Sequence, residues 1–181
     1  SPNGLGIIFR GTKPIFTYAV SRKICEANVL TIATRAIKEE DVARFLNRDE
    51  IDRLYSACRF SPNGELLKLV KVALYTGMRR GEILNLKAED IKDGHITILS
   101  TMTCRTKTRR SRKIPIHRQI ESILAEVRSG RIFTAWNKDR LNRAYSRAVR
   151  RSSLGELRFH DLRHTFASQY LQNGGTLADL M

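Results

Sequence analysis

The sequence predicts an α+β fold that is mainly helical and carries one small antiparallel β-sheet. Apolar residues recur at helical spacing before residue 93 and again after residue 118, which indicates helices on both sides of the sheet in sequence. Two short isoleucine-containing runs, at 95–99 and 114–116, interrupt that pattern and indicate strands. The chain has 181 residues, of which 41% are hydrophobic, so it is long enough to enclose a packed core.

The first 46 residues differ in character from the rest. Glycine and proline are frequent in residues 1–14, which we interpret as a loose leader or as residues added for expression. Residues 15–27 are rich in apolar side chains and predict a short buried helix. The mixed, charged residues 28–46 predict a linker, so the main domain is expected to begin at residue 47.

Two helices are predicted ahead of the sheet. Asn47 and Glu50 have the three-residue separation of a capping box, which predicts that a helix begins there. The Ser-Pro-Asn-Gly turn at 61–64 ends this helix. Residues 66–75 are strongly apolar and are followed by Gly77, which is typical of a core helix with a glycine stop signal.

The sheet is predicted to be a hairpin. The turn signal Asp93-Gly94 precedes the first strand, and the basic stretch 101–113 joins the two strands. Helical periodicity then returns in four segments: 119–127, 138–151, 160–173 and the start of a last helix at Thr176.

The charge balance favours a polyanionic partner. Lys and Arg number 33 against 18 Asp and Glu, the formal net charge is +15, and the isoelectric point is near 10.4. No apolar run approaches the ~18 residues that a membrane span needs, and no signal peptide is recognisable. We therefore expect double-stranded DNA or another nucleic acid as partner, no membrane, and a cytoplasmic location.

The cysteines indicate neither a disulfide nor a metal site. Cys25, Cys58 and Cys104 are odd in number and widely spaced, and the sequence contains no Cys-x-x-Cys or His-Glu-x-x-His motif. We expect buried or free thiols, no structural metal and no cofactor.

Arginines gather in two parts of the sequence. In the helix predicted at 138–151 they recur at spacings of three, four and three, so they share one face, while Leu141 and Tyr145 lie toward the other. A face of nearly pure positive sign favours contact with backbone phosphates, with simple solvation as the alternative. The predicted DNA-binding residues are Arg80, Arg105, Arg109, Arg110, Arg112, Arg140, Arg143, Arg147 and Arg150.

Three residues from distant parts of the chain predict one anion-binding cluster. His160 and Arg163 are three apart, so on a helix they project from the same face. Arg79 follows the core helix within Thr-Gly-Met-Arg-Arg-Gly-Glu at 76–82. Each signal taken alone is also typical of a solvated surface residue. Together they suit chemistry on a phosphodiester.

The order and spacing of three sequence blocks resemble the tyrosine recombinase (phage integrase) family. The blocks are Thr76-Gly77-x-Arg79-x-x-Glu82-x-x-x-Leu86, then Thr106-Lys107, then His160-x-Leu162-Arg163-His164-Thr165-x-Ala167. The resemblance covers residues 45–181. It implies the DNA breaking-rejoining fold of the recombinase catalytic domain, which agrees with the predicted α+β class.

The resemblance also implies a chemistry and a role for each motif residue. In this family a tyrosine attacks a DNA phosphodiester and forms a transient 3′-phosphotyrosine link, so neither a metal nor another cofactor is needed. Arg79 and Arg163 would stabilise the phosphate oxygens, and Lys107 would protonate the leaving 5′-oxygen. His160 would relay a proton or donate a hydrogen bond. The supporting residues would be Glu82, which orients the arginines, and His164, which we interpret as structural.

The same resemblance implies a domain organisation. Residues 15–46 would be the last helix of a core-binding domain plus a linker, and residues 47–181 would be the catalytic domain, truncated before the nucleophilic tyrosine. Tyr170 follows Arg163 by seven residues in one predicted helix, a separation of about 10 Å, so we expect that it is not the nucleophile. Full-length relatives assemble as tetramers on DNA. We expect this fragment to be a monomer.

The predicted function is therefore site-specific DNA recombination or integration, carried by a DNA-binding catalytic fragment that lacks its own nucleophile and is inactive for cleavage alone. The alternative is a non-catalytic DNA-binding protein that occupies recombination sites or complements a full-length recombinase. A helix-turn-helix regulator would leave Lys107 and the three spaced blocks unexplained. In either of the first two cases we expect a bacterial or phage protein associated with the nucleoid.

Overall fold

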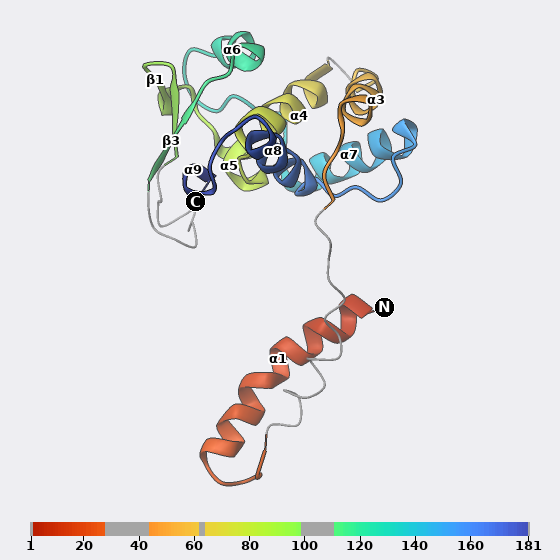
Figure 1. Ribbon diagram of the computed structural model, residues 1–181, viewed down its shortest axis with the longest axis vertical. Helices are drawn as coiled ribbons and strands as arrows, with labels where there is room; N and C mark the ends of the chain where they lie inside the picture. Colours follow the sequence, from red (N-terminus) through yellow and green to blue (C-terminus); the bar gives the residue numbers. More distant parts are fainter. Residues whose placement is uncertain (1, 28–43, 62–63, 99–110, 181) are drawn as a thin grey trace. The chain divides into compact units, whose positions relative to one another are not determined.

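The computed structural model describes residues 2–27, 44–61, 64–98 and 111–180, with only the backbone for 2–11 and 179–180. The chain divides into two compact units, Ser1–Val42 and Ala43–Met181. Of the elements described, α1 (Pro2–Ser21) belongs to the first unit, and the others form the second (Figure 1).

The first unit contains a longer helix than the sequence predicts. The loose segment expected at 1–14 and the helix expected from residue 15 form one continuous helix, α1. Pro14 lies inside α1, where its ring removes one backbone hydrogen bond without ending the helix. Ile15 and Tyr18 are 65% and 58% exposed, so the expected burial is also not seen. The glycine and proline content of residues 1–14 wrongly predicted a loose segment, because intrinsic helix propensity is only a weak preference.

Helix α3 (Arg48–Cys58) begins at the predicted capping box. Asn47 Oδ1 accepts a hydrogen bond from the Glu50 backbone N–H at 2.9 Å. Glu50 Oε2 accepts one from the Asn47 N–H at 3.0 Å. Both bonds satisfy N–H groups that lack partners inside the helix, and the prediction is confirmed.

Helix α4 (Glu65–Thr76) is the central helix of the second unit. Leu69 and Val70 on it are fully buried. Its end is set by Gly77, which has a φ of 60° and donates its N–H to the Ala73 carbonyl at 3.0 Å. A left-handed residue after the last turn is the usual helix stop. The predicted core helix and its glycine signal are confirmed.

The predicted antiparallel sheet is confirmed, with one strand more than expected. It is preceded by α5 (Arg80–Asn85) and the 3-10 helix η2 (Ala88–Asp90), and its strands are β1 (Ile91–Lys92), β2 (His95–Ile98) and β3 (Arg112–Pro115). The strand order is β1-β2-β3, and Ile96 pairs with Ile114 so that both point into the core. Strand β1 has two residues, too few to show an alternating pattern in sequence.

Four helices complete the second unit: α6 (Arg118–Ala125), α7 (Lys138–Ser152), α8 (Asp161–Gln172) and α9 (Leu177–Leu180). Helix α4 packs against α6 and α8, and α3 packs against α7. In Figure 1 the sheet and α6 therefore lie at one end of this unit and α3 and α7 at the other, with α4, α5 and α8 between them.

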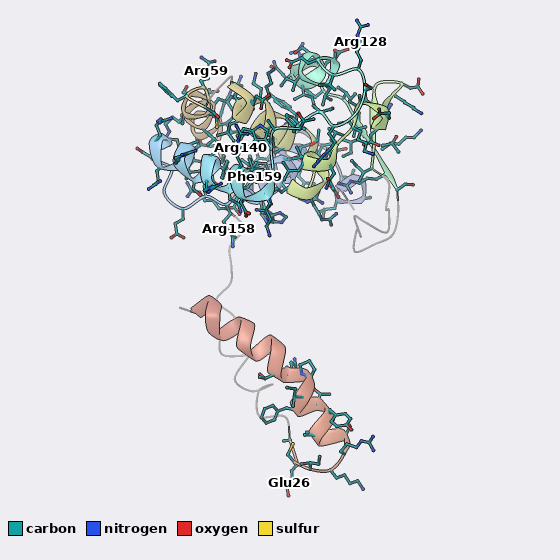
Figure 2. The ribbon with its side chains drawn as sticks, turned by 180° about the vertical axis from the view of Figure 1, so that it is seen from behind. Glu26, Arg59, Arg128, Arg140, Arg158 and Phe159 are labelled. Carbon is teal, nitrogen blue, oxygen red and sulfur yellow. The ribbon has the colours of Figure 1, made fainter. Side chains whose placement is uncertain are left out.

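Helix α7 has the predicted division into two faces. Leu141, Tyr145 and Val149 are buried against the core, whereas the four arginines at 140, 143, 147 and 150 are exposed. The helix is capped by Asn137, whose Oδ1 accepts from the Arg140 N–H at 2.8 Å. Figure 2 looks onto this side of the second unit, where Arg140, Arg158 and Phe159 are labelled.

Two of the three cysteines lie in described parts of the chain, and both are free thiols. Cys25 belongs to the first unit, and Cys58 is fully buried in the second, where burial raises its pKa to about 12. Cys104 lies outside the described residues. Across the described ranges, no helix combines the length and the apolar character that crossing a membrane requires.

Candidate active site

Arg79 stands at the junction of α4 and α5. It is the N-cap of α5, with extended backbone, and its own N–H donates to Glu82 Oε2 at 2.8 Å. Its guanidinium Nη1 donates to Glu82 Oε1 at 3.2 Å, and its side chain remains 44% exposed. Arg79 is therefore held at its base by Glu82 while much of its guanidinium still reaches solvent.

Glu82 is the buried centre of this cluster. Its side chain is only 4% exposed, and a second arginine, Arg112 at the start of β3, donates to both carboxylate oxygens. Arg112 Nη1 lies 3.2 Å from Oε1, and Nη2 lies 2.6 Å from Oε2. Burial by itself would raise the pKa of Glu82, but the hydrogen bonds from Arg112 and the Arg79 backbone outweigh it and hold the pKa below the usual range. The carboxylate is therefore ionised at neutral pH.

Arg163 reaches the same cluster from α8. Its Nη1 donates to the carbonyl oxygen of Gly77, the residue that ends α4. Burial lowers the pKa of Arg163, and the positive charges of Arg79 and Arg112 lower it further. Arg79 and Arg112 share the Glu82 carboxylate, and Gly77 lies two residues before Arg79, so the three guanidinium groups belong to one region. The predicted convergence of Arg79 and Arg163 is what the structure has.

A close helix contact makes this convergence possible. A Cβ added to Gly77 would lie 2.3 Å from Cδ1 of Phe166, which means that the Phe166 ring rests directly on the glycine backbone. Phe166 follows Arg163 by three residues on α8, so the two side chains leave neighbouring positions of that helix. The missing side chain at Gly77 thus lets α8 approach until Arg163 can bond the Gly77 carbonyl.

His160 and His164 meet at the start of α8. Their rings are 5.0 Å apart and nearly perpendicular, at 88°. Burial lowers the pKa of His160, and the neighbouring His164 and Arg163 lower it further. His160 is therefore neutral at physiological pH, with one ring nitrogen able to donate a hydrogen bond and the other able to accept a proton.

The depressed pKa of His160 gives a testable expectation. Replacing Arg163 with methionine removes one nearby cation, so the pKa of His160 is expected to rise part of the way toward its ordinary value, while burial, His164 and Arg158 continue to lower it. Because the folded-state pKa lies below the unfolded one, this group favours folding above the unfolded pKa, and its contribution is lost as the pH falls. An NMR titration of the His160 ring measures the shift. The same titration of Arg128→Met, an exposed arginine elsewhere on the unit, is the control and is expected to match the unaltered chain.

A cavity of about 740 Å³ lies beside Arg79 and His160. Its polar lining residues are Arg79, Arg80, Asn142, Ser146, Arg158 and His160. A groove of about 390 Å³ along α7 shares Asn142 and Ser146 with this cavity, and its basic lining residues are Arg143, Arg147 and Arg150. The cavity and the groove are therefore neighbours, and together we call them the charged path along α7.

Residues 44–181 match the phage integrase family. The chain belongs to this family. The integrase of Escherichia phage P2 is 30% identical to it over 148 residues, which are 81% of this chain and 41% of that protein. The chain spans about two fifths of the length of the curated relatives it matches. The resemblance inferred from the three sequence blocks is therefore confirmed.

Solved integrase structures confirm the predicted fold. The catalytic domain of bacteriophage HP1 integrase matches with a TM-score of 0.62 and 32% identity, covering 75% of this chain and 76% of that domain. A lambda integrase tetramer bound to a Holliday junction matches with a TM-score of 0.73 over 96% of this chain and 55% of that one. Its 24% identity shows likeness of fold alone. The helical unit with a three-stranded sheet thus has the fold of an integrase catalytic domain.

The remaining DNA-binding candidates of this integrase domain differ in their surroundings. Arg80 donates to Asn142 Oδ1 on α7 at 2.6 Å. Arg140 is held by the Ala135 carbonyl at 2.7 Å and lies over the Trp136 ring. Arg143, Arg147 and Arg150 line the α7 groove, whereas Arg112 is bound to Glu82. The predicted Lys107, Arg105, Arg109 and Arg110 lie outside the described residues.

The sequence analysis missed the partner of Arg112 and the place of Arg158 in the site. The Glu82–Arg112 pair joins residues thirty apart, and no local pattern links them. Arg158 lines the cavity, and its backbone N–H and Nε both donate to the buried Asp161, at 2.7 and 3.4 Å. Arg158 lies two residues before His160 in the sequence, and this closeness to a predicted site residue could have indicated its place in the site. Asp161 thus shapes the turn that leads into α8.

The two tyrosines near the site are both packed against neighbouring groups. Tyr170 lies on the uninterrupted helix α8, with its ring 6.0 Å from that of Phe166 and packed so closely on Gly175 that an added Cβ there would lie 2.1 Å away. Tyr145 lines the cavity, but it is only 3% exposed, and burial raises its pKa. A buried phenol with a raised pKa is a poor source of phenolate.

Proposed function

We propose that this chain is the DNA-binding catalytic portion of an enzyme for site-specific recombination or integration of double-stranded DNA. The observation that carries the proposal is that Arg79 and His160 line one cavity, while Arg163 bonds the carbonyl of Gly77, two residues before Arg79, in a chain of the phage integrase family. Three guanidiniums and one carboxylate leave this region with a surplus of positive charge, which a phosphodiester would offset.

The proposed chemistry is a reversible exchange of phosphate esters. A tyrosine gives up its hydroxyl proton to His160 or to water, its oxygen attacks the phosphorus, the bond from phosphorus to the 5′-oxygen breaks, and the leaving oxygen takes a proton from Lys107. Arg79 and Arg163 donate hydrogen bonds to the non-bridging oxygens as negative charge builds on them. His160, which is neutral, donates a hydrogen bond to the phosphate or relays a proton. The ester energy stays in the 3′-phosphotyrosine link, so this scheme needs no cofactor.

The charged path along α7 is the proposed track for the DNA backbone. Arg143, Arg147 and Arg150 would contact phosphates ahead of the reacting one, and Arg80 and Arg158 would contact those nearest the cavity. We accordingly place the protein with bacterial or phage DNA in the cytoplasm, at the nucleoid. We further propose that the chain of residues 1–181 is monomeric by itself.

We also propose that none of the tyrosines of this chain is the nucleophile, so the chain alone makes no covalent link to DNA. Support comes from the packing of Tyr170 against Phe166 and Gly175 and from the burial of Tyr145. The nucleophile would come from a polypeptide segment that carries the family's tyrosine, whether joined to this chain or supplied by another molecule.

A nicked recombination-site duplex that traps the covalent intermediate tests the proposal. The chain by itself is expected to bind this duplex without forming an adduct. Joined to a segment that carries the tyrosine of a related integrase, it is expected to form the adduct. An adduct at Tyr170 would overturn the exclusion of that residue. Binding without any adduct, even with the tyrosine supplied, would favour a non-catalytic protein that occupies recombination sites.

A further inference from the structure

Arg112 holds the buried carboxylate of Glu82 more completely than Arg79 does. Its two terminal nitrogens reach both carboxylate oxygens, at 3.2 and 2.6 Å, in a fork-to-fork pair. The guanidinium of Arg79 donates one hydrogen bond to Glu82, at 3.2 Å, and its backbone N–H donates another. The side chain of Arg112 is 32% exposed and that of Arg79 is 44% exposed. Arg112 is thus the main side-chain partner of the buried acid.

The way in which Arg112 and Arg79 share the hydrogen bonds to Glu82 determines how free the Arg79 guanidinium is. A buried carboxylate needs hydrogen-bond donors for both oxygens, and a bidentate arginine is the strongest partner available to it. If Arg112 did not fill this role, Glu82 would draw the guanidinium of Arg79 into the same two-pronged pair. Arg79 would then have fewer N–H groups directed at a phosphate in the cavity that it lines.

We propose that Arg112 is a positioning residue for the phosphate site, which acts by occupying both oxygens of Glu82 so that Arg79 stays available to the phosphate. The inference rests on the proposed function, because it assumes that Arg79 and Arg163 bind a phosphodiester. Arg112 enters the strand next to the basic hairpin, so its pairing with Glu82 also joins β3 to the start of α5. One side chain thereby links the sheet to the loop that carries Arg79.

Direct contact between Arg112 and the DNA backbone is the competing explanation. In that case the charge of Arg112 would matter and its fork geometry would not. The substitution Arg112→Lys separates the two, because a lysine keeps the charge but has a single ammonium that cannot span two carboxylate oxygens in plane. Arg112→Met removes both the charge and the fork. Arg128→Met is the matched control, since it removes an exposed arginine that Figure 2 labels at the opposite edge of the unit from Arg158.

The test is a titration of the chain of residues 1–181 with inorganic phosphate, followed by NMR of the Arg79 and Arg163 side-chain N–H groups. Arg112→Met is expected to weaken phosphate binding about tenfold, the effect of misplacing one charge-assisted hydrogen bond. Arg112→Lys is expected to weaken it by more than about threefold. Arg128→Met is expected to bind as the unaltered chain does. The carboxyl carbon signal of Glu82, followed over pH, is expected to show a raised pKa in both Arg112 variants.

The outcomes separate the inference from the function on which it rests. Normal phosphate binding and a normal Glu82 titration in Arg112→Lys, with weak binding in Arg112→Met, would show that only charge matters and would overturn the positioning role. Unchanged behaviour of both variants would also overturn it. If the unaltered chain showed no phosphate binding at Arg79 and Arg163, the proposed function itself would fail. Circular dichroism establishes whether each variant is folded. If Arg112→Met unfolds, the positioning role is still tested by phosphate binding and by the Glu82 titration in Arg112→Lys.

Discussion

Replacing Arg163 with alanine is expected to slow DNA strand cleavage by about 10²- to 10³-fold, the usual loss when one donor to a developing oxyanion is removed. The measurement is single-turnover cleavage of a nicked site by the chain joined to a tyrosine-bearing integrase segment. We attribute the expected loss to the chemical step because the Arg163 guanidinium belongs to the cluster of Arg79 and Arg112, where burial, and then their positive charges, lower its pKa. Positively charged neighbours destabilise Arg163 in the empty site, and an anionic phosphate would relieve this repulsion.

The control for this result is Arg59→Ala, which removes the same charge from an exposed position at the end of α3. It is expected to cleave within about twofold of the unaltered protein, in keeping with the small effects of remote surface changes. Binding of the duplex to the Arg163 variant should persist, because the arginines along α7 remain. A rate loss of less than about fivefold for Arg163→Ala would contradict its role at the phosphate.

Gly77→Ala is expected to be the most destabilising single substitution of a glycine in the second unit. The new methyl would meet the Phe166 ring at 2.3 Å, and the backbone at this position has a φ of 60°. The left-handed conformation costs a residue with a side chain roughly 1–2 kcal/mol. Forcing extra volume into a packed contact costs about 1–3 kcal/mol more. Urea unfolding should therefore show a loss of about 2–5 kcal/mol.

Two variants separate the conformational part of this loss from the steric part. Gly64 has almost the same φ, 63°, but no atom of the described residues lies within 4 Å of its added Cβ, so Gly64→Ala is expected to lose only the roughly 1–2 kcal/mol of the backbone term. Adding Phe166→Leu to Gly77→Ala is expected to recover part of the steric term, which a double-mutant cycle measures. Equal losses for Gly64→Ala and Gly77→Ala would contradict the close contact between α8 and the end of α4.

Features set by neighbouring residues were predictable from the sequence. The capping box of Asn47 and Glu50 depends on a three-residue spacing, and it forms as expected. The spacing of arginines along α7 fixes which side faces solvent, because a helix advances by 3.6 residues a turn. The glycine stop at Gly77 is likewise a local signal. The anion-binding cluster of Arg79, His160 and Arg163 was predicted from residue types, and the family resemblance strengthened that prediction by supplying long-range information that periodicity lacks.

Features that depend on contacts between distant segments were not predictable. Nothing near Arg112 indicates that its partner is Glu82, because the pair forms only when β3 lies beside the start of α5. The sequence placed Arg112 with the DNA-binding arginines for its charge alone. The full length of α1 was missed because local residue types, not distant contacts, gave the wrong indication. Glycines and Pro14 argue against a helix locally, yet the structure continues the helix through them.

Thr165 gives the site a connection to the start of the second unit. Its hydroxyl is fully buried, donates to the Asp161 carbonyl at 2.9 Å and accepts the Leu46 backbone N–H at 3.0 Å. Arg44 adds a second tether, to the Glu156 carbonyl at 2.6 Å. Arg44 also pairs with Glu50 of α3, at 3.3 Å. Any displacement of residues 44–46 would therefore act both on α3 and on the helix that begins at His160 and carries Arg163.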